Sequence, residues 1–154
     1  MKALLVVFSY HHNNTEKIAN VFAKVFDAQI KTPQQTDPVE LDAYELLGFG
    51  AGIDSGKHYK PLLDFADKLP AVTDKKAFIF STSGVSNTRY KAKIHAELKE
   101  KLQSKGYNIV DDFNCKGFNT NSFLKFIGGM NKGRPNEEDL ERAEEFAQNL
   151  KKNL

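Results

Sequence analysis

The stretch at residues 3–19 constrains the fold of this chain more than any other part of the sequence. It begins with an apolar run at 3–8 that is long enough for a strand and has no polar face, which predicts a buried parallel strand. A polar loop follows at 9–15, and apolar residues then recur at helical spacing from position 18 to position 26. A strand that enters a helix through a short polar loop gathers free backbone N–H groups and the positive end of the helix dipole, which together favour an anion.

Further apolar runs alternate with helical patterns along the rest of the chain. Strands are expected at 28–31, 44–52, 76–81 and 107–115, and helices at about 62–69, 88–105 and 136–150. Gly106 is expected to end the helix before it and Asn136 to cap the last helix, and a short helix is expected between 36 and 42. Five strands with interleaved helices predict one α/β domain over residues 1–154, with a parallel sheet covered by helices on both faces.

Composition and charge narrow the classes of function. The chain has 154 residues and no apolar run near ~20 residues, so no membrane-spanning helix is expected. Its 22 basic and 20 acidic residues give a net charge of +2, which is too small and too scattered to indicate nucleic acid. The single cysteine, Cys115, forbids an intrachain disulfide and a cysteine-based zinc site and fits a reducing compartment. We therefore expect a cytoplasmic monomer or weak dimer with no nucleic-acid or membrane partner.

Polar residues follow the first strand at the point where such sheets bind ligands. In doubly wound sheets, ligands lie beyond the carboxyl ends of the strands, where the strand order reverses. The candidate residues of this first loop are Ser9, Tyr10, His11, His12, Asn13, Asn14 and Thr15. These neutral donors suit a terminal phosphate and not a metal-bound triphosphate, which needs a lysine. The loop also lacks the carboxylates of a phosphoacceptor domain, the cysteine of a cysteine-dependent phosphatase and the glycine fingerprint of a dinucleotide site.

Two more loops are expected at the same edge of the sheet. The second is rich in glycine, and glycine lets backbone approach a flat ligand closely because it has no Cβ. Its candidate residues are Gly50, Ala51, Gly52, Ile53, Asp54, Gly56, Lys57 and His58. The third loop offers small hydroxyl groups and a further glycine, at Ser81, Thr82, Ser83 and Gly84. One phosphate loop and two loops for a planar ring are what a mononucleotide such as FMN requires.

The chain resembles the flavodoxin-like family over its whole length, in the order of its elements and in three motifs. The motifs are Asn-Thr-Glu-Lys-Ile-Ala at 14–19, Gly-Phe-Gly at 48–50 and Phe-Ser-Thr-Ser-Gly at 80–84. The resemblance implies a three-layer sandwich around a five-stranded parallel sheet in the order 2-1-3-4-5. It also implies FMN at the switch between the first and third strands, and one-electron transfer between partner enzymes.

Two features depart from the family pattern. Asn13 stands where the family's phosphate loop has glycine, with His11 and His12 in the middle of the loop; asparagine also tolerates a left-handed backbone. The connection at 116–135 is long for a compact domain. It is interpreted as a lid or partner surface near the flavin. The alternative is an irregular segment that only packs locally against the domain.

The resemblance implies a carbonyl that turns to meet the reduced flavin ring, at Gly52 or Gly56, and it leaves open which aromatic residue stacks on the ring. The candidates for stacking are His58, Tyr59, Tyr90 and Phe118. Basic residues follow the two ring-facing loops, at Lys57, Lys60, Arg89, Lys91 and Lys93. They are expected to make the reduced flavin less strongly reducing than in acidic relatives, or to bind an acidic partner.

Three functions remain open from the sequence. The first is an electron carrier that serves redox partner proteins. The second is an FMN-dependent NAD(P)H, quinone or flavin reductase. The third is a binding module that keeps the fold without the flavin.

Overall fold

The computed structural model describes residues 1–9, 14–117 and 132–154. The strands are β1 (Ala3–Phe8), β2 (Gln29–Lys31), β3 (Leu46–Asp54), β4 (Lys57–His58), β5 (Lys75–Ser83) and β6 (Tyr107–Lys116). The helices are α1 (Asn14–Phe26), α2 (Lys60–Asp67), α3 (Thr88–Ser104) and α4 (Glu137–Asn153). Two short 3-10 helices, η1 (Pro33–Gln35) and η2 (Pro38–Ala43), lie between β2 and β3, where a single short helix is expected from the sequence.

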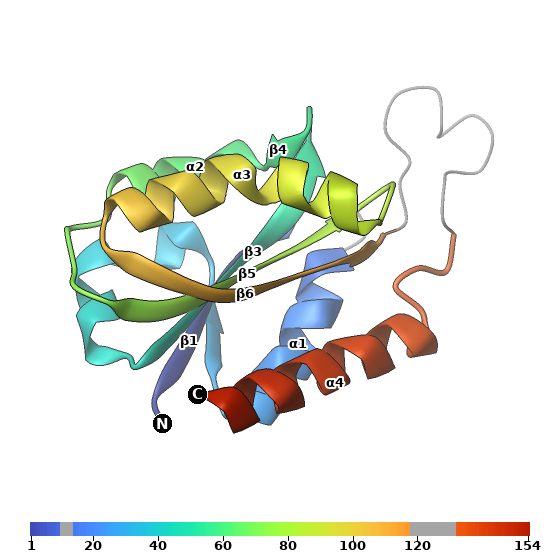
Figure 1. Ribbon diagram of the computed structural model, residues 1–154, viewed down its shortest axis with the longest axis horizontal. Helices are drawn as coiled ribbons and strands as arrows, with labels where there is room; N and C mark the ends of the chain where they lie inside the picture. Colours follow the sequence, from blue (N-terminus) through green and yellow to red (C-terminus); the bar gives the residue numbers. More distant parts are fainter. Residues whose placement is uncertain (10–13, 118–131) are drawn as a thin grey trace.

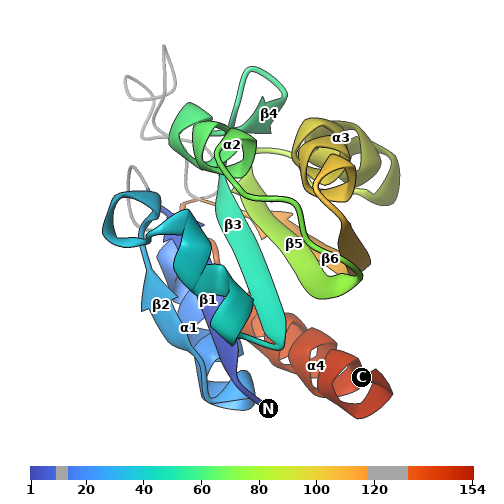
Figure 2. The same ribbon diagram turned by 90° about the vertical axis from the view of Figure 1, so that its left-hand side faces the viewer.

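The long strands form one parallel sheet in the order β2-β1-β3-β5-β6. Without the two-residue β4, the five strands have the predicted order 2-1-3-4-5, so the predicted α/β architecture is confirmed. The sheet is the middle of three layers, with α1 and α4 on one face and α2 and α3 on the other (Figures 1 and 2). This arrangement brings the carboxyl ends of β1, β3, β5 and β6 to the same edge.

The interior strand β1 is apolar because it is covered on both faces. Alternate residues of β1 enter different cores: Leu4 and Val6 pack with α2 and α3, whereas Leu5 and Val7 pack with α1 and α4. In the second core, Phe22 of α1 is fully buried and makes edge-to-face contacts with rings of β5 and β6. Such ring pairs add about 0.5–1.5 kcal/mol beyond the area they bury, so they hold α1 firmly on the sheet.

Two helix ends have the residues predicted for them, Asn136 and Gly106, and Asn87 is a cap that the sequence analysis did not predict. The Asn136 side chain accepts a hydrogen bond from the backbone N–H of Asp139, whose carboxylate accepts one in return from the N–H of Asn136. Asn87 caps α3 in a similar way, through the N–H of Tyr90. After α3 ends, Gly106 has a φ of 101°, as expected for a glycine that stops a helix.

The second predicted loop is largely a strand. β3 continues through Gly50 and Gly52 as far as Asp54, and the turn itself is confined to Ser55 and Gly56, which have φ values of 53° and 81°. The strand expected at 44–52 therefore ends two residues later than predicted, and the expected ligand loop at 50–58 is a strand end followed by a tight turn and β4. A Cβ at Gly50 would lie 2.2 Å from the ring of Phe80, so this glycine makes room for an aromatic ring on the neighbouring strand rather than for a bend.

Candidate functional site

The first candidate loop ends at the start of α1, beside β5. Asn14 and Thr15 are the first residues of α1, and both are buried. The hydroxyl groups of Thr15 and Thr82 share a hydrogen bond of 2.9 Å, which ties the helix start to the end of β5. The hydroxyl oxygen of Ser9 accepts a hydrogen bond of 3.3 Å from the backbone N–H of Glu16. The other predicted residues of this loop, Tyr10, His11, His12 and Asn13, lie outside the described residues.

Gly117 is a site residue that the sequence analysis missed. Its backbone N–H donates to the carbonyl oxygen of Ser83 at 3.0 Å, so it follows β6 at the edge where the candidate loops meet. A Cβ at this position would lie 2.7 Å from Nδ2 of Asn14. The glycine therefore allows the end of β6 to approach the N-terminus of α1, and nothing local in the sequence indicates that contact.

The sequence left open whether Gly52 or Gly56 has the carbonyl that turns toward the flavin, and the two glycines have different surroundings in the turn between β3 and β4. β4 pairs antiparallel with the end of β3, Ile53 with His58 and Asp54 with Lys57, so the chain forms a tight hairpin. At Gly52 a Cβ would lie 2.6 Å from the ring of Tyr59, whereas at Gly56 it would meet no atom within 4 Å. Gly56, at the exposed tip with positive φ, is therefore the glycine whose peptide has room to turn.

The side chain of His58, a residue of β4, is buried beneath the hairpin and is not exposed on its surface. Its side chain is 1% exposed, Nε2 donates to the carbonyl oxygen of Phe80 at 3.1 Å, and its ring lies 5.1 Å from that of His95. Burial, followed by the neighbouring charge of His95, lowers the pKa of His58 to about 3, so the ring is neutral at pH 7. The His58 ring therefore adds no positive charge at pH 7, and protein atoms cover it in this structure, so its contact with a bound ring stays a prediction.

Three polar side chains on β5, α3 and β6 form a network in which Ser81 and His95 are buried and Asp112 is partly exposed. Oγ of Ser81 lies 2.6 Å from Nε2 of His95, whose Nδ1 donates to Asp112 at 2.7 Å. Burial alone would raise the pKa of Asp112, but the hydrogen bond and charge of His95, with help from Lys91, lower it to about 2. The hydrogen-bonded series Ser81–His95–Asp112 resembles the catalytic triad of a hydrolase. However, Ser81 is 0% exposed, so a substrate carbonyl cannot reach its hydroxyl group. The network joins three elements behind the candidate site.

The third predicted loop is also strand at its start, because β5 continues through Thr82 and Ser83. The two hydroxyl groups have different partners: Thr82 meets Thr15, while Ser83 donates to the carbonyl oxygen of Val85 and accepts from Asn114. The prediction placed Ser81, Thr82 and Ser83 together at the ligand. Alternation along β5 sends their side chains to opposite faces, so only Thr82 faces the first loop.

The thiol of Cys115 is expected to be unreactive in the folded protein. Its thiol is fully buried, and burial raises its pKa to about 12, so almost no thiolate is present at pH 8. A chromogenic disulfide reagent should therefore react with Cys115 only when the protein is unfolded. Reaction of about one thiol per chain within minutes in the absence of denaturant would contradict this expectation.

The described residues exclude two other kinds of site. They contain no group of three or more histidine, cysteine, aspartate or glutamate side chains placed to hold a metal ion. Each helix within this part of the chain is too short or too polar to cross a lipid bilayer.

Comparison with known proteins identifies the class. A family model described as a flavodoxin domain matches residues 5–148. A protein of Methanocaldococcus jannaschii described as uncharacterized is 46% identical over 153 residues, covering 99% of this chain and 100% of that protein. This chain therefore belongs to the flavodoxin domain family.

Solved structures agree on the fold. Flavodoxin 2 from Bacillus cereus is similar with a TM-score of 0.75 at 19% identity, over 100% of both chains. A flavodoxin from Streptococcus pneumoniae has a TM-score of 0.71 at 19% identity, again over 100% of both chains. At these identities the likeness supports the fold alone.

Proposed function

We propose that this protein binds FMN and acts as an electron-transfer protein between redox enzymes. The observation that carries the proposal is the meeting of three parts at one edge of the sheet. These parts are the N-terminus of α1 with Asn14 and Thr15, the β3–β4 hairpin, and the end of β5 at Thr82. Membership of the flavodoxin domain family supports a flavin as the ligand.

The residues fit the phosphate end of FMN by their chemistry. The start of α1 offers backbone N–H groups, the hydroxyl of Thr15 and the amide of Asn14, next to the positive end of the helix dipole. These neutral donors suit a phosphate monoester, whose charge is delocalised over terminal oxygens that accept several hydrogen bonds. A Cβ at position 117 would clash with the side-chain amide of Asn14. Because Gly117 has no Cβ, the amide can occupy the position that it has in this structure.

The residues around the hairpin suit the flat end of the same ligand. When bound, FMN supplies one- and two-electron redox chemistry that no side chain of the protein has. The exposed tip at Ser55 and Gly56 presents backbone N–H and C=O groups, and Gly56 has the space for a peptide rotation. Lys57 and His58 belong to β4, where they hold the tip, so we assign them no direct contact with the ring.

The proposal predicts that the hydroxyl of Thr15 and the amide of Asn14 carry FMN affinity. Replacing both (Asn14→Ala with Thr15→Ala) should weaken FMN binding about a hundredfold or more, because two hydrogen bonds to a charged group are lost and each costs about 1.5–3 kcal/mol. The measurement is an FMN titration followed by flavin absorbance and fluorescence. Thr15→Ser, which keeps a hydroxyl, should bind FMN close to the unmodified protein.

The controls separate misfolding from loss of the site. Asn108→Ala changes an exposed amide at the opposite end of β6 and should leave FMN affinity unchanged. Unchanged affinity in the double variant would remove the phosphate assignment, and failure of the unmodified protein to take up FMN would remove the proposed function. Steady consumption of NAD(P)H with a quinone by the FMN-loaded protein would favour the reductase instead of the carrier.

A further inference from the structure

The N-terminal half of α3 carries positive charge where a helix does not favour it. Its first turn contains no acidic residue, and Arg89, Lys91 and Lys93 lie within its first six residues. Cations at a helix N-terminus oppose the helix dipole, typically by about 0.3–1 kcal/mol each. By contrast, α4 begins with three acidic residues, at positions 137–139. The charges that begin α3 are therefore not explained by the stability of the helix.

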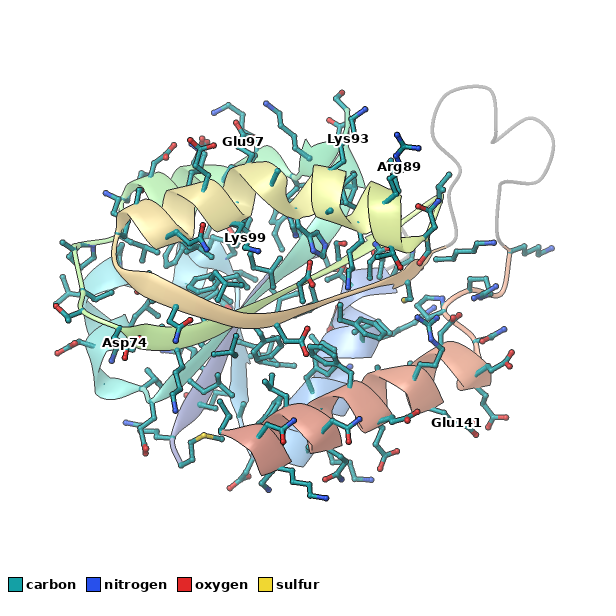
Figure 3. All side chains as sticks on the ribbon, in the orientation of Figure 1. Asp74, Arg89, Lys93, Glu97, Lys99 and Glu141 are labelled. Carbon is teal, nitrogen blue, oxygen red and sulfur yellow. The ribbon has the colours of Figure 1, made fainter. Side chains whose placement is uncertain are left out.

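Two of these cations remain exposed on one face. Lys91 pairs with Asp112 at 3.2 Å, whereas no ion pair of Arg89 or Lys93 is found among the described residues. Arg89 and Lys93 are four residues apart and project from the same side of α3, with Glu97 further along it (Figure 3). Like charges at this spacing repel each other. Glu97 is partly neutralised by Lys57 of β4, at 3.6 Å, so the face is positive overall.

This face borders the candidate flavin site. It begins directly after β5, where the loop to α3 exposes Val85, an apolar side chain that is 48% exposed. It continues to β4 of the hairpin, which packs against α3 (Figure 1). An apolar residue beside exposed cations matches the apolar centre and polar rim of many protein interfaces. The same edge of the sheet thus holds a proposed redox site and a charged surface next to it.

We propose that Val85, Arg89, Lys93 and Lys57 form a docking face for the acidic surface of a redox partner protein. This inference rests on the proposed function, because the face has this role only if a flavin is bound beside it. Charge complementarity accelerates encounter between proteins, and it holds the two redox centres close while one electron passes from one to the other. No bond forms or breaks: one centre is oxidised and the other reduced by the same electron.

The sign of the charge at the face can be measured with small redox probes. The FMN-loaded protein is reduced, and its oxidation by ferricyanide (an anion) and by tris(phenanthroline)cobalt(III) (a cation) is followed at increasing ionic strength. The ferricyanide rate should fall by about tenfold as salt screens the attraction, and the cobalt rate should not fall. In a charge-reversal variant (Arg89→Glu with Lys93→Glu), the two salt dependences should exchange.

A matched control keeps the same change in net charge. Lys24→Glu with Lys99→Glu reverses two exposed lysines, on α1 and on the second half of α3, and should leave the ferricyanide salt dependence unchanged. Equal salt dependence in the two double variants would mean that net charge, and not this face, steers the probes. That result would overturn the proposal while leaving FMN binding intact.

Binding of an acidic peptide tests the face without any electron transfer. A peptide of glutamate residues should bind the unmodified protein at low ionic strength, and an equally long peptide of glutamine should not. The Arg89/Lys93 variant should lose this binding at least tenfold more than the control variant. Equal binding by both variants would overturn the docking face while FMN uptake keeps the proposed function. Absence of FMN uptake would overturn the proposed function and with it the redox role of the face, and face-dependent peptide binding would then show only that the face binds acidic chains.

Discussion

Replacing Gly106 by alanine is expected to lower the free energy of unfolding by about 4 kcal/mol. Gly106 has a φ of 101°, which strains any residue with a Cβ, and the new Cβ would lie 1.7 Å from the carbonyl oxygen of Val72. Because the obstructing atom belongs to the backbone, no rotamer change can relieve the contact. Urea unfolding followed by circular dichroism measures the loss.

Gly133 supplies the matched control for this substitution. It has a similar φ of 82°, but a Cβ there would meet no atom within 4 Å. Gly133→Ala should therefore cost only the backbone strain, about 1 kcal/mol. Equal losses in the two variants would show that strain alone governs position 106 and that the segment around Val72 moves aside.

Replacing His58 by glutamine is expected to remove much of the acid sensitivity of the fold. Burial lowers the pKa of His58 to about 3 from an ordinary value of 6.5. Between these values the unfolded chain binds a proton that the folded protein does not, so stability is full above about pH 6.5 and falls as the pH is lowered toward 3. The slope is up to about 1.4 kcal/mol per pH unit, which amounts to roughly 5 kcal/mol over the whole window.

The measurement is the urea midpoint at pH 7, 6, 5 and 4. Glutamine can donate to the Phe80 carbonyl from a similar position but does not titrate, so His58→Gln should unfold at a more nearly constant midpoint. Asp112→Asn provides a contrast: the pKa of Asp112 is lowered to about 2, so its contribution is lost only as the pH falls below about 4. Parallel pH profiles for unmodified protein and His58→Gln would refute the assignment.

The sequence predicts the helices and strands of this protein well because the patterns that indicate them are local. The apolar run at 3–8, the periodic residues of α1, and the cap at Asn136 each depend on neighbours within a few residues. The parallel sheet and its order follow from this alternation together with the resemblance to a known family. The predicted FMN contacts in the first loop remain predictions, since they await a ligand.

The sequence could not predict features that depend on contacts between strands. The sequence places Gly48 and Gly50 in a strand, but it does not show that the rings of Phe78 and Phe80 occupy the space beside them. Likewise His58 follows a charged lysine and looks exposed, yet α3 and β5 cover it completely. The sequence suggests that the Ser81 hydroxyl group faces a ligand, but in the structure it is hydrogen-bonded to His95 of the next helix.

The anchoring of the β3–β4 hairpin has a consequence for the speed of electron exchange. β4 is fastened to β3 by backbone pairing and to β5 through the His58 imidazole, so little of the hairpin other than Ser55 and Gly56 is free to move. When the charge on a neighbouring ring changes, polar groups that are already fixed need little rearrangement. Under the proposed function, a scaffold of this kind would keep the reorganisation energy small, so that an electron could pass in either direction with a modest driving force.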